Sequence, residues 1–139
     1  MSTHAIIAIS DGINIRASYV HFDGYPSHTG VILNGYYNTP DKINSLIDLG
    51  ELSSIGPIAK SRELWSTGPD TDYCQAYGRD RGEKGTEPKK FTSLSDLIAY
   101  GKSYYAAYIY LFEDNRWVVK QISNDVWIPI EYAIKKDEN

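Results

Sequence analysis

The sequence predicts an α+β domain in which an antiparallel sheet of about five strands carries about three helices packed on one face. Three observations predict this class: a hairpin signal near the N-terminus, three segments with helix start and stop signals, and a run of short apolar segments in the last third. The first hairpin and the final meander should supply the sheet. We expect residues 1–134 to form one domain and residues 135–139 to be a disordered tail.

The opening segments read as a β-hairpin. Residues 4–9 are apolar, Asp11-Gly12 is a strong turn signal, and residues 13–22 alternate in character. The alternation predicts that one face of this strand is buried and the other is solvent-exposed, at least as far as Ser18. The buried set is Ile13, Ile15, Ala17, Tyr19 and His21, and the wet set is Asn14, Arg16 and Ser18.

Three helices are expected from spacing and capping. The first covers residues 26–37, with Pro26 in its first turn and an apolar stripe that ends at Tyr36. The second begins after Thr39, which caps it, and stops at Gly50. The third begins after Thr92 or Ser93 and closes at Gly101.

The last third reads as a meander of residues 107–112, 117–122 and 126–132. Pro129 cannot donate to a neighbouring strand, so the last segment should lie at a sheet edge. Residues 51–90 are rich in Gly and Pro. A segment of this length without regular structure is typical of a functional or a disordered region.

Composition limits the function classes. The net charge of −4 argues against nucleic acid as a general ligand. No apolar run is long enough for a membrane span, and the N-terminus has no secretion-signal pattern. The single Cys74 cannot form an intrachain disulfide, which favours a reducing cytoplasm. Tyr makes up 12 of the aromatic residues, which suits either a recognition surface or half-exposed strands.

The first candidate site is the corner of residues 21–28. It carries His21, Asp23, Tyr25 and His28 around a Gly and a Pro that turn the chain. Two imidazoles and a carboxylate could ligate a metal or act in acid–base catalysis, but no third compact ligand pair is evident. We expect structural or binding histidines, no metal and no cofactor.

The second candidate is the segment of residues 77–82, which carries Tyr77, Arg79 and Arg81. Five of the 14 basic residues fall between Arg79 and Lys90. Two arginines can offer forked donors to phosphate or carboxylate, and Trp65 and Tyr77 could stack on a base. The alternative is a solvated loop whose arginines pair with nearby acids.

Other catalytic signatures are missing from the sequence. Cys74 has no neighbouring base and reads as a small buried residue. There is no phosphate-binding Gly-rich loop of Walker type, no G-x-S-x-G elbow, no H-E-x-x-H and no paired C-x-x-C. Enzymatic activity therefore lacks positive support in these motifs, which favours a binding protein.

A resemblance adds context. The corner His-Phe-Asp-Gly-Tyr-Pro, the segments 37–42 and 49–55, and Gly-Arg-Asp-Arg-Gly-Glu at 78–83 resemble a family of small accessory proteins of tailed phages and prophages. The likeness covers residues 4–120. In that family Trp usually stands where Phe22 stands, and His often stands where Gly78 stands. The resemblance implies a protein that binds a host enzyme or immune effector, or that sequesters a nucleotide signal, in the host cytoplasm.

Two functions follow as hypotheses. The first is a non-enzymatic counter-defence factor whose partner is a host protein or a small anionic, nucleotide-like ligand, with no membrane role and the homo-oligomeric state left open. Its binding residues are His21, Asp23, Tyr25, His28, Trp65, Tyr77, Arg79 and Arg81. The second is a small hydrolase or nuclease in which His21 and Asp23 form the acid–base pair and the arginines hold the anion. Both require the corner and the arginine segment to meet in space.

Overall fold

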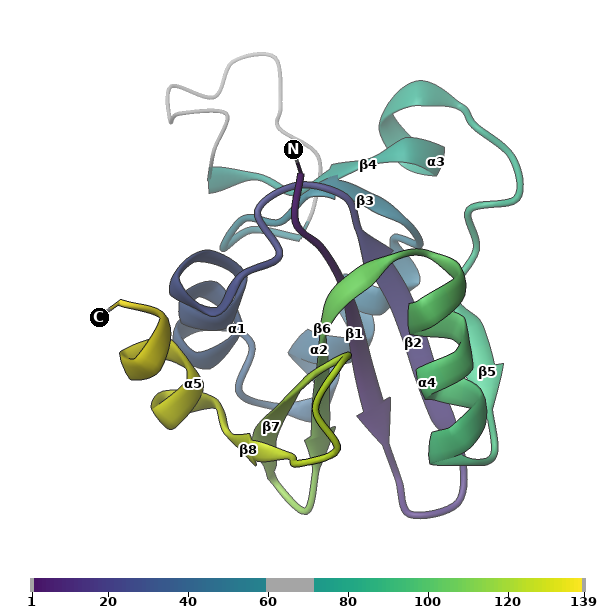
Figure 1. Cartoon of the computed structure of the whole chain (residues 1–139). Helices are drawn as coiled ribbons and strands as arrows, with labels where there is room; N and C mark the ends of the chain where they lie inside the picture. The colour runs from purple at the N-terminus through teal and green to yellow at the C-terminus, as the bar shows by residue number, and fades with distance from the viewer. Residues whose placement is uncertain (1, 60–71, 139) are drawn as a thin grey trace.

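The computed structural model describes residues 2–59 and 72–138 (Figure 1). Within them one mixed sheet of eight strands is accompanied by helices on both faces. The strands are β1 (His4–Ser10), β2 (Ile15–Val20), β3 (Leu52–Ser54), β4 (Gln75–Ala76), β5 (Lys89–Phe91), β6 (Ala106–Glu113), β7 (Arg116–Gln121) and β8 (Ile128–Pro129). The helices are a π-helical turn (η1, Pro26–Gly30), α1 (Val31–Tyr36), α2 (Pro40–Asp48), α3 (Tyr77–Arg81), α4 (Leu94–Ser103) and α5 (Ile130–Asp137).

The strand order is β4-β3-β2-β1-β6-β7-β8, and β5 also pairs with β2. The expected hairpin and meander are both present, but β1 joins them by running parallel to β6, and β3 runs parallel to β2. The prediction of a purely antiparallel sheet of about five strands is therefore wrong. Central parallel strands are buried on both faces, which is why β1 is an almost continuous apolar run.

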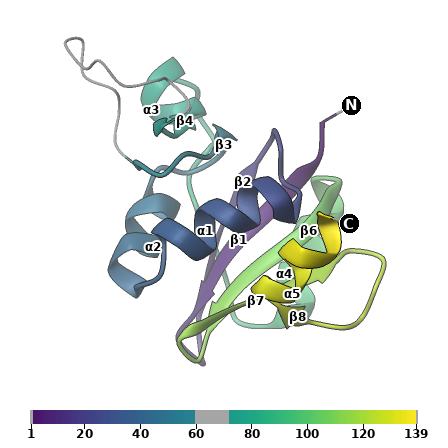
Figure 2. The same ribbon diagram turned by 90° about the vertical axis from the view of Figure 1, so that its left-hand side faces the viewer.

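The expectation of helices on one face is also wrong (Figure 2). Alternate residues of β1 and β6 point to opposite sides, so Ile7 and Tyr110 belong to one core while Ile6 and Ile109 belong to the other. The first core lies under α1, α2 and α5, and the second lies under α4. Burying each of these isoleucines stabilises the fold by roughly 2 kcal/mol.

Helix α2 covers the face of β2 that was expected to be solvent-exposed. The Arg16 guanidinium donates to Asn44 Oδ1 and Asp48 Oδ1, both at 2.5 Å. The Ser18 hydroxyl donates to the Gly50 carbonyl, and Ser18 is only 3% exposed. Polar side chains therefore mark a face packed under a helix here, because α2 and the residues that follow it supply their partners.

The three expected helices are present. The first is divided into η1 and α1, Thr39 caps α2 by accepting from Lys42 N, and Ser93 caps α4 by accepting from Asp96 N. α4 continues past Gly101 to Ser103. Among the described helices, none combines the length and apolar character needed to cross a bilayer.

The C-terminal segment differs from its expected structure. Of residues 126–132 only Ile128–Pro129 form a strand, and it does lie at the edge of the sheet. Helix α5 follows at once and continues through the expected tail to Asp137. Buried Ile130 and Ala133 hold the first turn of this helix to the core.

The segment of residues 51–90 contains β3, β4, α3 and the start of β5, so its described parts are regular in several places. β3, β4 and α3 gather at the end of the sheet where β1 begins and β2 ends, whereas β5 pairs with the start of β2 (Figure 1). Gly50 allows this crossing, because its φ is +78° and a Cβ there would lie 2.1 Å from the Thr86 carbonyl oxygen. Trp65 lies outside the described residues.

Candidate functional site

Six aromatic side chains converge at the end of the sheet where β1 begins and β2 ends. They come from β1, β2 and the corner after it, α3, and the end of α4, and we call them the His–Tyr cluster. Its members are His4, Tyr19, His21, Phe22, Tyr77 and Tyr104.

His21 is the centre of the His–Tyr cluster. Its ring stacks on His4 with centroids 4.6 Å apart and meets Phe22 edge-on at 4.4 Å. The Tyr77 ring lies edge-on at 6.4 Å, and Tyr19 lies at 6.0 Å. Offset and edge-on pairs of this kind add roughly 1 kcal/mol each beyond their buried area, so the rings hold one another in place.

Backbone hydrogen bonds bring Tyr77 to His21. The His21 N–H donates to the Leu52 carbonyl at 2.9 Å, which extends the pairing of β2 with β3 beyond Val20. The Tyr77 N–H donates to the Glu51 carbonyl at 3.1 Å, immediately before β3. Glu51 and Leu52 therefore hold Tyr77 and His21 beside each other, although Tyr77 follows His21 by 56 positions in the sequence.

The hydrogen bonds assign protons to the two imidazoles. His4 Nδ1 lies 2.6 Å from the His21 carbonyl oxygen, which can only accept, so His4 Nδ1 carries a proton. His21 Nδ1 lies 2.8 Å from the Tyr19 hydroxyl. Burial first, and then the charges of Tyr77, Glu51 and Tyr104, raise the pKa of Tyr19 to about 12, so its phenol keeps its proton at neutral pH.

With Tyr19 donating, a neutral His21 carries its own proton on Nε2. Burial, followed by the nearby His4, lowers the pKa of His21, which favours this neutral form. In their neutral forms the stacked rings thus present an acceptor at His4 Nε2 and a donor at His21 Nε2. This pair can hydrogen-bond to a peptide or amide group of a partner.

Glu51 sets the charge beside the rings. The Tyr104 hydroxyl donates to Glu51 Oε2 at 3.0 Å, and burial together with this carboxylate raises the pKa of Tyr104. The Tyr104 ring in turn lies 4.9 Å from Tyr19. The Arg81 guanidinium lies 5.1 Å above the Tyr77 ring. The His–Tyr cluster therefore has a carboxylate at Tyr104 and a guanidinium at Tyr77.

The corner of residues 21–28 is divided between two surfaces. Asp23 is exposed with φ 56°, and its carbonyl accepts from the Thr29 hydroxyl. Tyr25 and His28 form a separate pair with ring centroids 6.1 Å apart. They belong to η1 and its cap, which pack against α5, and Ser27 N–H donates to an Asp137 carboxylate oxygen there. The structure brings only the His21 end of the corner to α3.

The two arginines of α3 differ. Arg79 donates to the Ala59 carbonyl at 2.5 Å, to the Cys74 carbonyl at 2.7 Å, and to both carboxylate oxygens of Asp80. Its side chain is 23% exposed. Arg81 is exposed and covers Tyr77. Arg79 thus ties α3 to the chain around it, and Arg81 is the arginine that stands at the surface.

Cys74 lies in a buried polar environment. The thiol donates to the Gly56 carbonyl and accepts from the Gly56 N–H, both at 3.3 Å, and Tyr37 Oη lies 3.6 Å away. Burial raises the pKa of Cys74, which opposes a role as a nucleophile. In residues 2–59 and 72–138, no three His, Cys, Asp or Glu side chains are grouped so that they could hold a metal.

Four cluster members and the neighbouring Glu51 were absent from the residues expected at the site; the four are His4, Tyr19, Phe22 and Tyr104. A signal for the first two existed in the hairpin, because the register pairs Ala5 with Val20 and so sets His4 opposite His21. Tyr19 was expected on the same face as His21, which the structure confirms. Tyr104 and Glu51 have no local signal, because only the packing of α4 and β3 brings them together.

Comparison of the chain with protein-family models, with curated proteins and with solved structures found no match.

Proposed function

We propose that this protein is a non-enzymatic binding protein that recognises another protein through the His–Tyr cluster and the exposed aromatic residues beside it. The observation that carries the proposal is the convergence, at one end of the sheet, of partly exposed rings from separate segments around the buried Tyr19. Aromatic residues and arginine are the side chains most enriched at the centres of protein interfaces.

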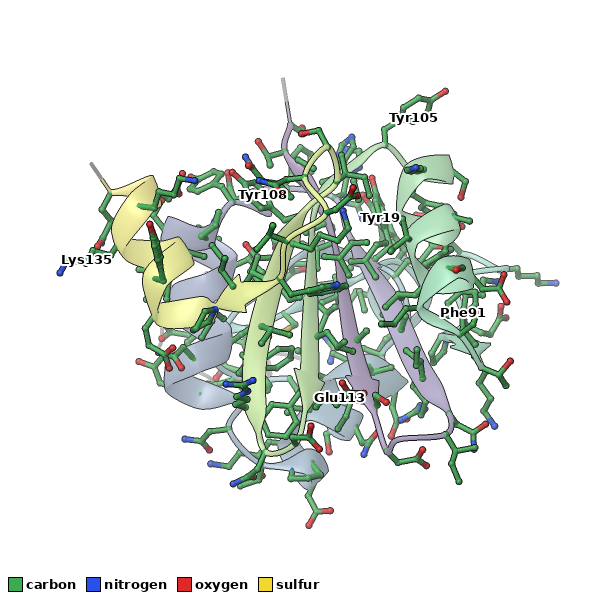
Figure 3. The ribbon with its side chains drawn as sticks, turned by 60° about the horizontal axis from the view of Figure 1, so that its bottom comes forward. Tyr19, Phe91, Tyr105, Tyr108, Glu113 and Lys135 are labelled. Carbon is green, nitrogen blue, oxygen red and sulfur yellow. The ribbon has the colours of Figure 1, made fainter. Side chains whose placement is uncertain are left out.

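The exposure of one member of the His–Tyr cluster and of one residue beside it supports the proposal. Phe22 is 42% exposed, and Tyr105, which directly follows Tyr104, is 86% exposed. Tyr105 projects away from the end of α4 (Figure 3) and has φ 58°, a conformation that glycine or asparagine adopts at lower cost. A bulky exposed aromatic in that conformation does not serve the fold, which favours a role in recognition.

A protein partner accounts for the geometry better than a nucleotide-like anion. The anion hypothesis needs two forked cations, and Arg79 is engaged by two carbonyl groups and by Asp80. The hydrolase hypothesis needs Asp23 to hold His21, and Tyr19 bonds to His21 Nδ1 instead. We therefore place the binding of a host protein first. In keeping with the phage resemblance, we propose that this binding inhibits a host defence component in the cytoplasm.

The experiment is site-specific photo-crosslinking in host-cell lysate. A photoreactive phenylalanine analogue replaces Phe22 in one sample and Tyr36 in another. Tyr36 is 53% exposed on α1 and serves as the matched control. We expect one host protein to be crosslinked from position 22 and not from position 36.

A second variant separates recognition from folding. Tyr105→Asn suits the left-handed backbone, so it should keep the stability of the protein while it weakens crosslinking from position 22. Tyr36→Asn should leave crosslinking unchanged. Equal crosslinking from positions 22 and 36, or no effect of Tyr105→Asn, contradicts the proposed surface.

A further inference from the structure

A hollow of about 610 Å³ lies at the opposite end of the sheet from the His–Tyr cluster. The β1–β2 turn, the β6–β7 turn, the start of α2 and Lys90 of β5 enclose it, and both turns lie at the lower end of Figure 1. Its size falls within the roughly 300–1,000 Å³ that small-molecule sites occupy. No function discussed above uses this hollow.

The floor of the hollow is apolar and well supported. Ile9 and Phe112 are 9% and 5% exposed, and Pro40 completes the apolar part. The Phe112 ring lies edge-on to Trp117 with centroids 5.3 Å apart. Because Ile9 and Phe112 are nearly covered, the exposed Pro40 is the apolar residue of the lining that a ligand can contact most freely.

The rim is polar, and its charges balance. The cations are Arg16 and Lys90, and the anions are Asp11 and Asp114. Arg16 is already bound to Asn44 and Asp48, so little net charge is presented to a ligand. A strongly anionic ligand would meet the two aspartates, which disfavours phosphates at this site.

Amide side chains supply the remaining polar groups, from Asn14, Asn44 and Asn115. Asn44 Oδ1 accepts from Arg16, which leaves the NH₂ group of this lining residue as its available donor. Each amide offers donors beside an acceptor, and each hydroxyl of a sugar needs a donor and an acceptor close together. An apolar ligand would leave these groups without partners at a cost of about 1–3 kcal/mol each.

We propose that this hollow binds a neutral carbohydrate of one or two sugar rings, with C–H groups of a ring against Pro40 and its hydroxyl groups on the asparagines. A charge-balanced rim of paired donors and acceptors above an apolar floor is the arrangement that such a ligand requires. The inference is independent of the His–Tyr cluster.

The test is NMR titration of the ¹⁵N-labelled protein with glucose, galactose, maltose, cellobiose and lactose at millimolar concentration. We expect at least one sugar to shift the side-chain NH₂ signals of Asn14, Asn44 and Asn115. Asn115 and Asp114 have φ 63° and 54°, so Asn115→Gly and Asp114→Gly remove rim groups without strain in the turn. Each should weaken the binding about tenfold, by the loss of hydrogen bonds to hydroxyl groups.

Asn34→Ala, on the exposed side of α1, is the matched control and should leave the affinity unchanged. The proposal is overturned if none of the five sugars shifts the rim signals, or if inorganic phosphate shifts them and the sugars do not. It is also overturned if both glycine variants bind sugar as the unmodified protein does.

Discussion

Replacing Arg79 with alanine should destabilise the fold by about 3 kcal/mol, whereas Arg81→Ala should change the stability by less than about 0.5 kcal/mol. Arg79 donates charge-assisted hydrogen bonds to the Ala59 and Cys74 carbonyls, each worth roughly 1.5 kcal/mol after allowance for its partial exposure. The pair with Asp80 lies near the surface and adds little. Arg81 makes one exposed contact with the Tyr77 ring.

Urea unfolding monitored by circular dichroism measures the free energy of unfolding of both variants. For a chain of this size, the loss in Arg79→Ala corresponds to a fall in Tm of roughly 10 °C. Equal stability of the two variants would refute the reasoning, because Arg79 would then not hold α3 in place. Arg79 would then be available to bind a ligand, and it would supply the second cation that a nucleotide-like ligand requires.

Three further predictions concern pH, backbone geometry and thiol reactivity. Because the pKa of His21 is lowered on folding, the stability it contributes is complete above about pH 6.5 and is lost as the pH falls through the folded-state pKa. Urea unfolding between pH 7 and pH 5 should show a shallower loss for His21→Gln than for His28→Gln. Gly50→Ala should cost more than about 3 kcal/mol, since its Cβ would meet a carbonyl oxygen, while Gly85→Ala, which has the same sign of φ in open space, should cost about 1 kcal/mol. Cys74 should react with a thiol reagent only when urea unfolds the protein, and a fast native reaction would contradict its burial.

Local signals predicted the elements that depend on nearby residues. A hairpin turn forms at Asp11-Gly12 as expected, with Asp11 Oδ1 accepting from the N–H groups of Ile13 and Asn14. The second strand begins at Ile15, however, and Ile13, which was expected to be buried, is 76% exposed in the turn. The caps Thr39 and Ser93 start their helices for the same local reason. These features were predictable because each is decided within a few residues of sequence.

Long-range pairing was not predictable in the same way. The parallel contact of β1 with β6 joins segments about 100 residues apart, and no local pattern selects it over an antiparallel neighbour. The unbroken apolar run of residues 5–9 did indicate burial on both faces, which implies helices on both sides.

The sequence of helix α5 does carry a helical pattern, although Pro129 indicated an edge strand at this place. Ile130, Ala133 and Ile134 follow helical spacing, Glu131 lies in the first turn, and two lysines lie in the last turn. A proline suits the position before a helix as well as a sheet edge, and here it serves at both.

The candidate site was predictable in part. His21, Tyr77 and Arg81 were expected and do lie together, whereas Asp23, Tyr25 and His28 turn towards solvent or α5. The corner redirects them because Gly24 packs against the start of β1, where a Cβ would lie 2.7 Å from the Ala5 Cβ. That close approach depends on tertiary structure, so spacing alone could not assign the direction of each side chain.

The central claim is that a partner protein binds at the His–Tyr cluster. It is tested most directly by comparing NMR spectra of the free and bound protein, once crosslinking has identified the partner. We predict that addition of the partner shifts the ring signals of His4, His21, Phe22, Tyr77 and Tyr105 while those of Tyr36 and Tyr132 stay in place. Shifts confined to the α1 and α5 side, with the His21 and Tyr77 signals unmoved, would contradict the account.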